Sequence, residues 1–374
     1  MIFYPKDFRI KPDAAGLFDE KDVMAQAEKS LRVAIPHITD AVSPHSPGTI
    51  HDYYSDADYW WPDETKPDGL PFVMKDGQTN PDNFVRHRLI LRQMRNLVSS
   101  LACGYQISGR EDFAERAVGI LKEFFLDERT RMHPNLEYAQ AIQGICKGRS
   151  IGVIDTLHLV DVPFAIEAVK HASCMDQETY QRLQDWFAQY LGWMLTSRNG
   201  IGEMIHPNNH SICYFVQVAA FASFTDNEQI LQFCRDQFKT HLIGQLKSDG
   251  TFPKELHRTK PYSYCAFVLD NFITLCYLLS TPDDNLWAFR SPEGSCCRKA
   301  LDFMMPYLVD KASWPYPPDI MHFEAFPVRY SFLVFAGLML GDERCLALYR
   351  RLPLHSDDEE ARRNMAIQYP MLWV

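Results

Sequence analysis

The sequence predicts an all-α protein, because apolar residues recur at helical spacing along most of the chain and strand-like alternation is scarce. Gly and Pro residues stand at the joints between these apolar stripes, as expected for helices joined by loops. The chain has 374 residues, 46% of them hydrophobic, which is ample for a large core. No linker or low-complexity tract divides it, so we predict a single domain over residues 1–374.

The expected helices follow one another along the chain with loops between them. Ser108-Gly-Arg-Glu111 has the pattern of a capping box, which predicts a helix beginning there. Antiparallel helices of moderate length fit a helical solenoid or an α/α toroid, which is an incomplete barrel of antiparallel helix pairs. No repeat of fixed period is present, which favours the toroid. The apolar stripes cover residues 90–101, 113–124, 183–194, 212–224, 228–242, 262–280, 296–309 and 329–351.

Residues 36–83 differ from the rest, because they show little periodicity and are rich in Pro, Gly, Asp and aromatic residues. A loop this long in a compact domain is usually functional or disordered, and its aromatic residues argue against disorder. Aromatic rings can stack on the C–H faces of sugars, or they can fill the core beneath the loop. The candidate sugar-binding residues of this loop are His51, Tyr53, Tyr54, Tyr59, Trp60 and Trp61.

Two further polar residues are candidates for substrate binding. Gln140 ends the stretch Asn135-Leu-Glu-Tyr138-Ala-Gln140, and Arg149 lies between Gly148 and Gly152. An amide can bind sugar hydroxyls, and an Arg can hold a carboxylate through two parallel hydrogen bonds. Ordinary capping or salt-bridging roles are an equal alternative for both.

The cluster Asn208-Asn209-His210 precedes an apolar helical stripe, so we expect it at a helix N-terminus. That position favours anions and disfavours an imidazolium ion. Asn209 can hydrogen-bond a carboxylate without adding charge, and Asn208 is a further binding candidate. The alternative is that Asn209 only caps the helix and His210 is a surface residue.

A second cluster runs from Arg258 through Tyr262 to Tyr264. Pro261 suits the first turn of the helix that follows, which places Tyr264 in that turn. A guanidinium beside a phenol favours the phenolate, so Arg258 would help Tyr264 to act as a base. The alternative is that Tyr264 is a half-buried core residue.

Charge and composition limit the partners of this chain. The formal net charge of −10 argues against general nucleic-acid binding, and a polyanionic substrate would need a locally basic site. No membrane span is predicted, and the segment Met1–Lys6 lacks the apolar stretch of a signal peptide. The expected location is the cytoplasm, or the periplasm if a leader was removed. No obvious metal-ligand set or required cofactor is present, and the sequence does not define an oligomeric state.

At these residues the chain resembles the alginate lyase superfamily of polysaccharide lyases, which fold as α/α toroids. The matching pieces occur in order between about residues 45 and 275, which covers most of the fold. The resemblance implies that the aromatic loop over residues 36–83 is a lid that covers the substrate. Family members are usually exported, so the missing leader is a departure from the family. The pieces are Ser46-Pro47-Gly48 to Trp61-Pro62, Asn135 to Gln140, Asn208-Asn209-His210, and Glu255 to Tyr264.

The resemblance implies a catalytic set of an Asn-His pair, an Arg and a Tyr. By motif these are Asn209, His210, Arg258 and Tyr264, and Tyr262 is a reserve phenol because the Arg-to-Tyr spacing varies within the family. The implied reaction is β-elimination on a β-1,4-linked polyuronate, either mannuronate-rich alginate or glucuronan. The amide and imidazole would neutralise the uronate carboxylate, while the phenol would take the C5 proton and return it to the leaving O4.

Two other functions fit parts of the sequence. A glycoside hydrolase of uronate-containing oligosaccharides would need a pair of carboxyl groups as acid and base. The carboxylates available for that role are Asp52, Asp56, Glu203 and Glu255. A non-catalytic sugar-binding helical protein would explain the aromatic loop, but it would leave the Asn/His/Arg/Tyr set without a role.

Overall fold

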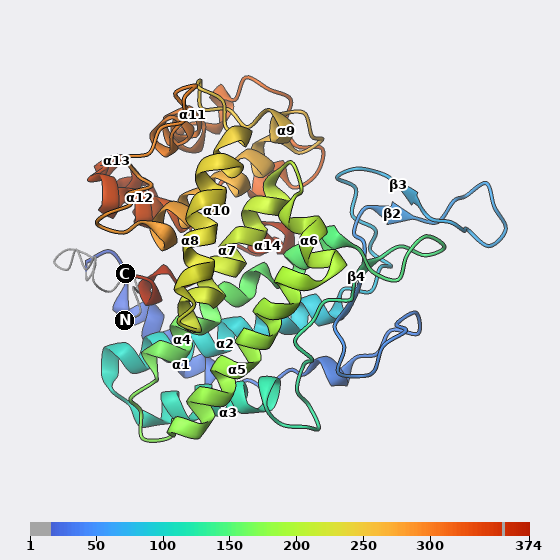
Figure 1. The fold of residues 1–374 in the computed structure, drawn as a ribbon, viewed down its shortest axis with the longest axis vertical. Coiled ribbons are helices and arrows are strands. Elements are labelled where there is room, and N and C mark those ends of the chain that lie inside the picture. The colour runs from blue at the N-terminus through green and yellow to red at the C-terminus, as the bar shows by residue number, and fades with distance from the viewer. Residues whose placement is uncertain (1–15, 354–355) are drawn as a thin grey trace. The chain divides into compact units, whose positions relative to one another are not determined.

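A computed structural model describes residues 16–353 and 356–374 (Figure 1). Contacts within the chain define two compact units. Of the described residues, unit 1 contains Asp76–Gln78 and those from Ile205 to Gln368, and unit 2 contains residues 16–75, Thr79–Met204 and Tyr369–Val374. The segment on which the leader expectation rests lies outside the described residues, and one domain over residues 1–374 stays a prediction.

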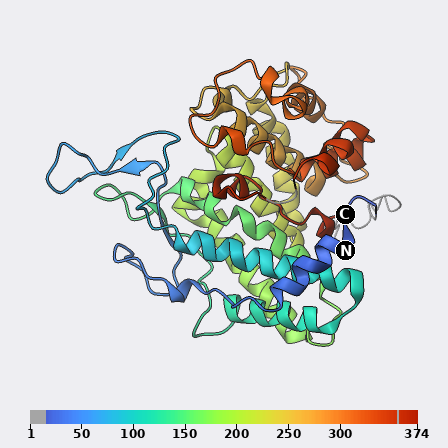
Figure 2. The same cartoon turned by 180° about the vertical axis from the view of Figure 1, so that it is seen from behind.

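Unit 2 is organised around its longest helix, α2 (Arg86–Ser108), which contacts α1, α3, α4, η3 and η7. Figure 2 shows α1 lying alongside α2. A buried ion pair between Arg95 and Asp161 joins α2 to α4, and the Trp373 indole donates to the same carboxylate at 2.8 Å. The other helices of unit 2 are α1 (Glu20–Ser30), α3 (Glu111–Phe125), η3 (Ser150–Val160), α4 (Asp161–Ala168), α5 (Gln177–Thr196), α6 (Arg198–Met204) and η7 (Pro370–Leu372).

The joint between α2 and α3 differs from the sequence prediction. The capping box is not formed, because α2 continues to Ser108 and the Ser108 hydroxyl donates back to the Gly104 carbonyl at 2.6 Å. Gly109 ends α2 in the left-handed region with φ 66°, a conformation that favours glycine. Arg110 is the N-cap residue of α3 and makes no capping hydrogen bond through its side chain.

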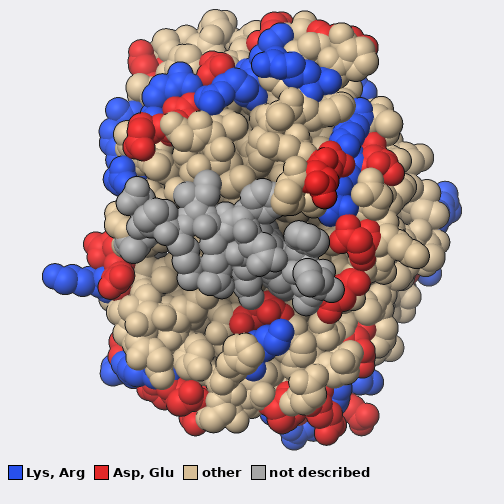
Figure 3. Space-filling view, turned by 60° about the vertical axis from the view of Figure 1, so that its left-hand side comes forward, with Lys and Arg blue, Asp and Glu red and all other residues tan. Residues whose placement is uncertain are grey.

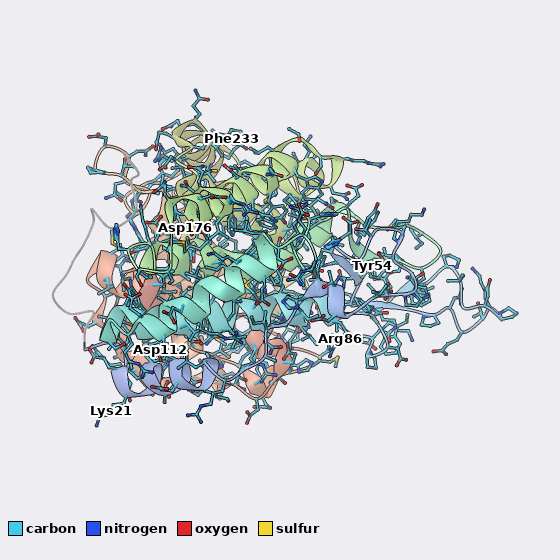
Figure 4. All side chains as sticks on the ribbon, turned by 90° about the horizontal axis from the view of Figure 1, so that it is seen from below. Lys21, Tyr54, Arg86, Asp112, Asp176 and Phe233 are labelled. Carbon is cyan, nitrogen blue, oxygen red and sulfur yellow. The ribbon has the colours of Figure 1, made fainter. Side chains whose placement is uncertain are left out.

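The segment 36–83 contains the 3₁₀ turn η2 (Ile38–Asp40) and three short strands. Strand β1 (Tyr54–Asp56) pairs in parallel with β4 (Tyr138–Ala141), and β1 also contacts α2. Figure 4 labels Tyr54 and Arg86 in this region. Strands β2 (Trp60–Trp61) and β3 (Val73–Met74) form an antiparallel hairpin, which extends away from the helices of unit 2 in Figures 1 and 2.

Unit 1 is built around α10 (Pro261–Leu279), which contacts α7, α8, α9, α11 and α12. By length and apolar composition α10 could cross a membrane, but 94% of its apolar window is buried, as is typical of a core helix. The other elements are α7 (Asn209–Phe224), α8 (Glu228–Thr240), η4 (Leu242–Gln245), α9 (Pro253–Leu256), α11 (Cys297–Val309), η5 (Lys311–Ser313), η6 (Phe323–Ala325), α12 (Phe332–Leu340), α13 (Glu343–Arg351) and α14 (Glu359–Arg363).

The apolar stripes predict most of these helices correctly. The stripe over residues 329–351 is the exception, because two helices occupy it. Gly341 ends α12 with φ 61°, and Asp342 then caps α13 by accepting from the backbone N–H of Arg344. On the face drawn in Figure 3, basic and acidic side chains are interspersed, so the acidic excess does not form one uniform patch there.

Candidate active site

The Asn208-Asn209-His210 cluster lies at the beginning of α7, as the sequence predicts. Asn208 is the N-cap residue, and its Oδ1 accepts from the backbone N–H of His210 at 3.3 Å. The same oxygen lies 2.6 Å from Nδ1 of His206, whose ring centroid is 5.0 Å from that of His210. The Asn208 side chain therefore serves the helix end, which leaves Asn209 and His210 as the candidates for chemistry.

Asn209 is anchored by a buried carboxylate on α9. Its backbone N–H donates to Oε1 of Glu255 at 2.9 Å, and its Nδ2 donates to Oε2 at 2.7 Å. Asn209 is 2% exposed and Glu255 is 1% exposed. Two hydrogen bonds from one residue to one carboxylate fix the orientation of the Asn209 amide. An amide nitrogen carries two hydrogens, so a second N–H remains for another acceptor.

Neighbouring polar residues also affect the protonation of Glu255. Burial raises the pKa of Glu255 above its ordinary value, although the hydrogen bonds from Asn209 and the charges of Arg258 and His210 oppose this. Burial likewise lowers the pKa of His206, and the charges of His210, Lys254 and Arg258 lower it further. The neutral form of His206 is thus favoured.

Arg258 joins the phenol of Tyr264 to this cluster. Its Nη2 donates to the Tyr264 hydroxyl oxygen at 3.2 Å, and the guanidinium lies 4.4 Å from the centroid of the Tyr264 ring. Tyr264 is in the first turn of α10, as predicted, and it is half-buried. A cation at this distance stabilises a phenolate, so the arrangement suits a Tyr that gives up and regains a proton.

The end of the long loop supplies the counter-ion of Arg258. Asp76 accepts from Arg258 Nη2 at 2.7 Å and from the Thr259 hydroxyl at 2.9 Å. Burial tends to raise the pKa of Asp76, but the hydrogen bonds and charge of Arg258 outweigh it and hold that pKa below its usual range. Gly77 follows with φ 73°, and a Cβ there would clash with Thr259 Oγ1.

Tyr262, the reserve phenol, is a core residue. Its side chain is fully buried, and its hydroxyl donates to the backbone carbonyl of Tyr307 at 3.0 Å. Burial raises the pKa of the Tyr262 phenol, which disfavours a phenolate. This corrects the expectation that Tyr262 contacts substrate, because neither its ring nor its hydroxyl is open to a ligand. Tyr264 is therefore the better candidate for the base.

Unit 2 contains a second polar network, centred on Asp155 of η3. One oxygen of Asp155 accepts from the Ser55 hydroxyl at 2.6 Å, the Tyr53 hydroxyl at 3.1 Å and Arg88 Nη2 at 3.2 Å. The other oxygen accepts from Gln140 Nε2 at 3.1 Å. A buried carboxylate with this many donors is well stabilised and holds the attached side chains in fixed positions.

Gln140 links the Asp155 network to Arg149 through hydrogen bonds. Gln140 Nε2 is turned toward Asp155, and its Oε1 accepts from Arg149 Nη2 at 2.8 Å. Gln140 also has an unusual backbone φ of 52°, which is typical of functional or strained positions. The Arg149 guanidinium lies 5.9 Å from the Trp60 ring centroid, and burial lowers the pKa of Arg149. Gln140, Arg149 and Trp60 are therefore brought together within unit 2.

Tyr53 and Tyr54 are buried in unit 2, with exposures of 0% and 1%. The Tyr53 hydroxyl is bonded to Asp155, and the Tyr54 hydroxyl donates to Asp56 at 2.7 Å. Burial raises the pKa of both phenols. The expectation that these two rings stack on a sugar is therefore wrong, and the alternative that loop aromatics fill the core applies to them.

The remaining candidates in the loop are half-buried. Trp61 lies on β2 with Lys75 Nζ 5.0 Å from its ring centroid, and Tyr59 directly precedes β2. The His51 Nδ1 lies 2.8 Å from the backbone oxygen of Arg131, which holds its ring near that of His133. Tyr59, Trp60 and Trp61 thus keep part of their ring surface available, whereas His51 is tied to a neighbouring loop.

The sequence reasoning missed three carboxylates that hold the candidate residues in place. Asp76, Asp155 and Glu255 are each buried or half-buried and each accepts hydrogen bonds from a candidate residue. The sequence marks Glu255 as the start of a motif and as a possible acid or base of a hydrolase, but not as the anchor of Asn209. Each of these residues also lies inside or beside a motif, but their partners are remote in the chain.

A family model described as alginate lyase matches residues 37–314. This span is well over half of the chain and includes every candidate residue described above. The chain belongs to the alginate lyase family. No match was found among curated proteins.

Solved structures of alginate lyases agree with this membership. The structure of an alginate lyase from Bacteroides ovatus is similar with a TM-score of 0.83 and 30% sequence identity, over 97% of this chain and 96% of the other. Alginate lyase A1-III from Sphingomonas species A1 is similar with a TM-score of 0.56 and 15% identity, over 92% and 93% of the two chains. The predicted all-α toroid fold is confirmed, and this alginate lyase family member is a polysaccharide lyase that acts on an anionic polysaccharide.

Proposed function

We propose that this lyase cleaves a β-1,4-linked polyuronate by β-elimination, with mannuronate-rich alginate as the first substrate to test and glucuronan as the second. The observation that carries the proposal is the 3.2 Å contact between Arg258 and the Tyr264 hydroxyl, next to an Asn209 amide anchored on Glu255. A phenol next to a cation, in the same unit as a fixed hydrogen-bond donor, supports this proposal.

In the proposed mechanism, Asn209 and His210 bind the carboxylate of the uronate. Their hydrogen bonds stabilise the enediolate that develops when C5 loses its proton. Tyr264, as phenolate, takes that proton, and the C4–O4 bond breaks to leave a C4=C5 double bond. In mannuronate and glucuronate the C5 proton and O4 lie on the same side of the ring. The protonated Tyr264 can therefore donate the same proton to the departing O4 oxygen.

Relatives of known chemistry support this choice of residues. Solved structures of alginate lyase A1-III include a variant with His replaced by Ala and a variant with Tyr replaced by Phe, each complexed with a tetrasaccharide. In this chain, we assign the corresponding roles to His210 and Tyr264. Gln140, Arg149 and Trp60, which meet within unit 2, are proposed to bind sugar.

The carboxylates considered for a hydrolase are engaged in other contacts. Asp52 contacts Thr49 and His133, Asp56 accepts from Tyr54, and Glu255 accepts from Asn209. Glu203 is fully buried. These contacts favour the lyase over the hydrolase, and no observation favours a non-catalytic sugar-binding protein.

The test is incubation of the purified protein with polymannuronate, polyguluronate and glucuronan in parallel. Elimination creates a double bond conjugated with the carboxylate, so ultraviolet absorbance should rise with the first or third polymer. New reducing ends without that absorbance would instead indicate hydrolysis. No product from any of the polymers would contradict the proposal.

A further inference from the structure

Unit 2 has a surface pocket of about 290 Å³ whose lining includes none of the candidate residues described above. It lies between the end of α3, the loop after it and the middle of α5. The floor is formed mainly by Phe125, Met132 and Trp186. The rim carries polar groups, which are Arg131, His133, Arg182, Asp185 and Gln189.

The floor of this pocket is rigid. The Trp186 indole N–H donates to the backbone carbonyl of Met132 at 2.9 Å, and its ring packs at 4.6 Å against that of Phe125. Arg182 Nη2 lies 3.4 Å from the backbone oxygen of Leu126 on the other side. These contacts link α3, the loop and α5, so the pocket is formed before any ligand arrives, as is usual for small-molecule sites.

The charges on the rim favour a single negative group. Arg131 and Arg182 are both cationic, and within residues 16–353 and 356–374 no side-chain hydrogen bond or ion pair engages the Arg131 guanidinium. His133 is paired with Asp52 at 2.9 Å, so that carboxylate is already occupied. Asp185 is the one carboxylate among the lining residues, and it accepts from Gln181 Nε2 at 3.1 Å.

We propose that this pocket binds one uronate residue of a polysaccharide or oligosaccharide, outside the catalytic set. The carboxylate would pair with Arg131 and Arg182, which suit it because a guanidinium offers two parallel donors. Gln189 and Asp185 would bind hydroxyl groups, and the half-buried Pro134, which also lines the pocket, would contact the C–H face of the ring. A doubly charged inorganic phosphate fits less well, because the Asp185 carboxylate repels it and the apolar floor has no hydrogen-bond donor for it.

The role of such a pocket rests on the proposed polyuronate substrate. Its ligand is either a segment of the polymer or a short product, and both present the same uronate chemistry. A second binding point on the same molecule keeps a polymer close after each cleavage, which raises its effective concentration. A pocket that binds only short products would instead make the activity sensitive to inhibition by those products.

The direct test uses sodium glucuronate, which has no glycosidic bond and therefore survives in the active protein. The indole N–H signal of Trp186 is followed by NMR and is assigned with the variant Trp186→Phe. We expect glucuronate to shift this signal, glucose to leave it unchanged, and the double variant Arg131→Ala/Arg182→Ala to weaken the response at least about tenfold. Arg129→Ala is the matched control, since Arg129 is nearby in sequence, exposed and outside the pocket.

A kinetic arm distinguishes the two sources of ligand. If polymer occupies the pocket, the double variant should raise KM for the polymer several-fold and leave KM for a trisaccharide unchanged. If product occupies it, only inhibition by added oligosaccharide should weaken. If glucuronate does not shift the Trp186 signal, or shifts it equally in the double variant, the pocket proposal is overturned even when the protein is an active lyase. A response to glucuronate in a protein that cleaves no polyuronate would sink the proposed function and keep the pocket.

Discussion

Asn209 and Glu255 form a two-point contact across 46 residues of sequence, in which the Asn209 backbone N–H and side-chain amide donate to the two oxygens of one carboxylate. Both residues are almost fully buried. The contact joins the start of α7 to α9, and it fixes the amide that we propose to bind the substrate carboxylate.

We expect Glu255→Gln to lower kcat about tenfold to a hundredfold while changing KM little. The Gln amide presents a donor where Glu255 presents an acceptor, so the Asn209 amide must turn or lose a bond, and stabilisation of the enediolate suffers. Steady-state kinetics on the polymer checks this. The control is Asp319→Asn, which disturbs another buried acceptor at the start of α10. Equal losses of kcat in both variants would assign Glu255 a purely structural role.

Tyr264 and Tyr262 should respond oppositely to loss of their hydroxyl groups. Tyr264→Phe should abolish turnover and keep binding of substrate, because only the proton carrier is removed. Tyr262→Phe should keep turnover but lower the free energy of unfolding by about 1 kcal/mol, because its hydrogen bond to Tyr307 is lost. Turnover and thermal unfolding of both variants check this. Full activity of Tyr264→Phe would move the role of base to another residue.

Asp76 makes part of the stability depend on pH. Its pKa is lowered in the folded protein, so its pairing with Arg258 contributes stability above the unfolded pKa of about 3.9 and loses it as the pH falls through the lower folded value. The variant Asp76→Asn should therefore be less stable than the parent at pH about 6, and this difference should shrink below pH about 4. Thermal unfolding across this range checks it, and a difference that is independent of pH would contradict it.

Asp155 should support both the stability and the substrate binding of unit 2. Asp155→Ala leaves the Arg88 guanidinium without this acceptor and frees the Gln140 amide, so we expect a loss of about 3 kcal/mol in the free energy of unfolding. Gln140→Ala should raise KM with a smaller loss of stability, because it removes the group that orients Arg149. Chemical denaturation and KM measurements separate the two effects. An unchanged KM in Gln140→Ala would remove this residue from the binding site.

The order of the helices and the location of the candidate catalytic residues could be predicted from the sequence. Helical periodicity and N-terminal signals are local, so the Asn208-Asn209-His210 cluster at the start of α7 and Pro261 in the first turn of α10 are visible in a few neighbouring residues, although the cap is Asn208 rather than Asn209. The failed capping box at Ser108 shows the limit of such signals, because the preceding helix continues through it.

Tertiary structure alone decided which polar and aromatic groups are open and which are held. All five Tyr residues in the two motifs look alike in the sequence. In the structure Tyr59 and Tyr264 are half-buried, whereas Tyr53, Tyr54 and Tyr262 are buried. The pairs Asp76–Arg258 and Asn209–Glu255 join positions 182 and 46 residues apart. A motif records the type of a side chain, whereas burial and hydrogen-bond partners depend on segments that meet only when the chain has folded.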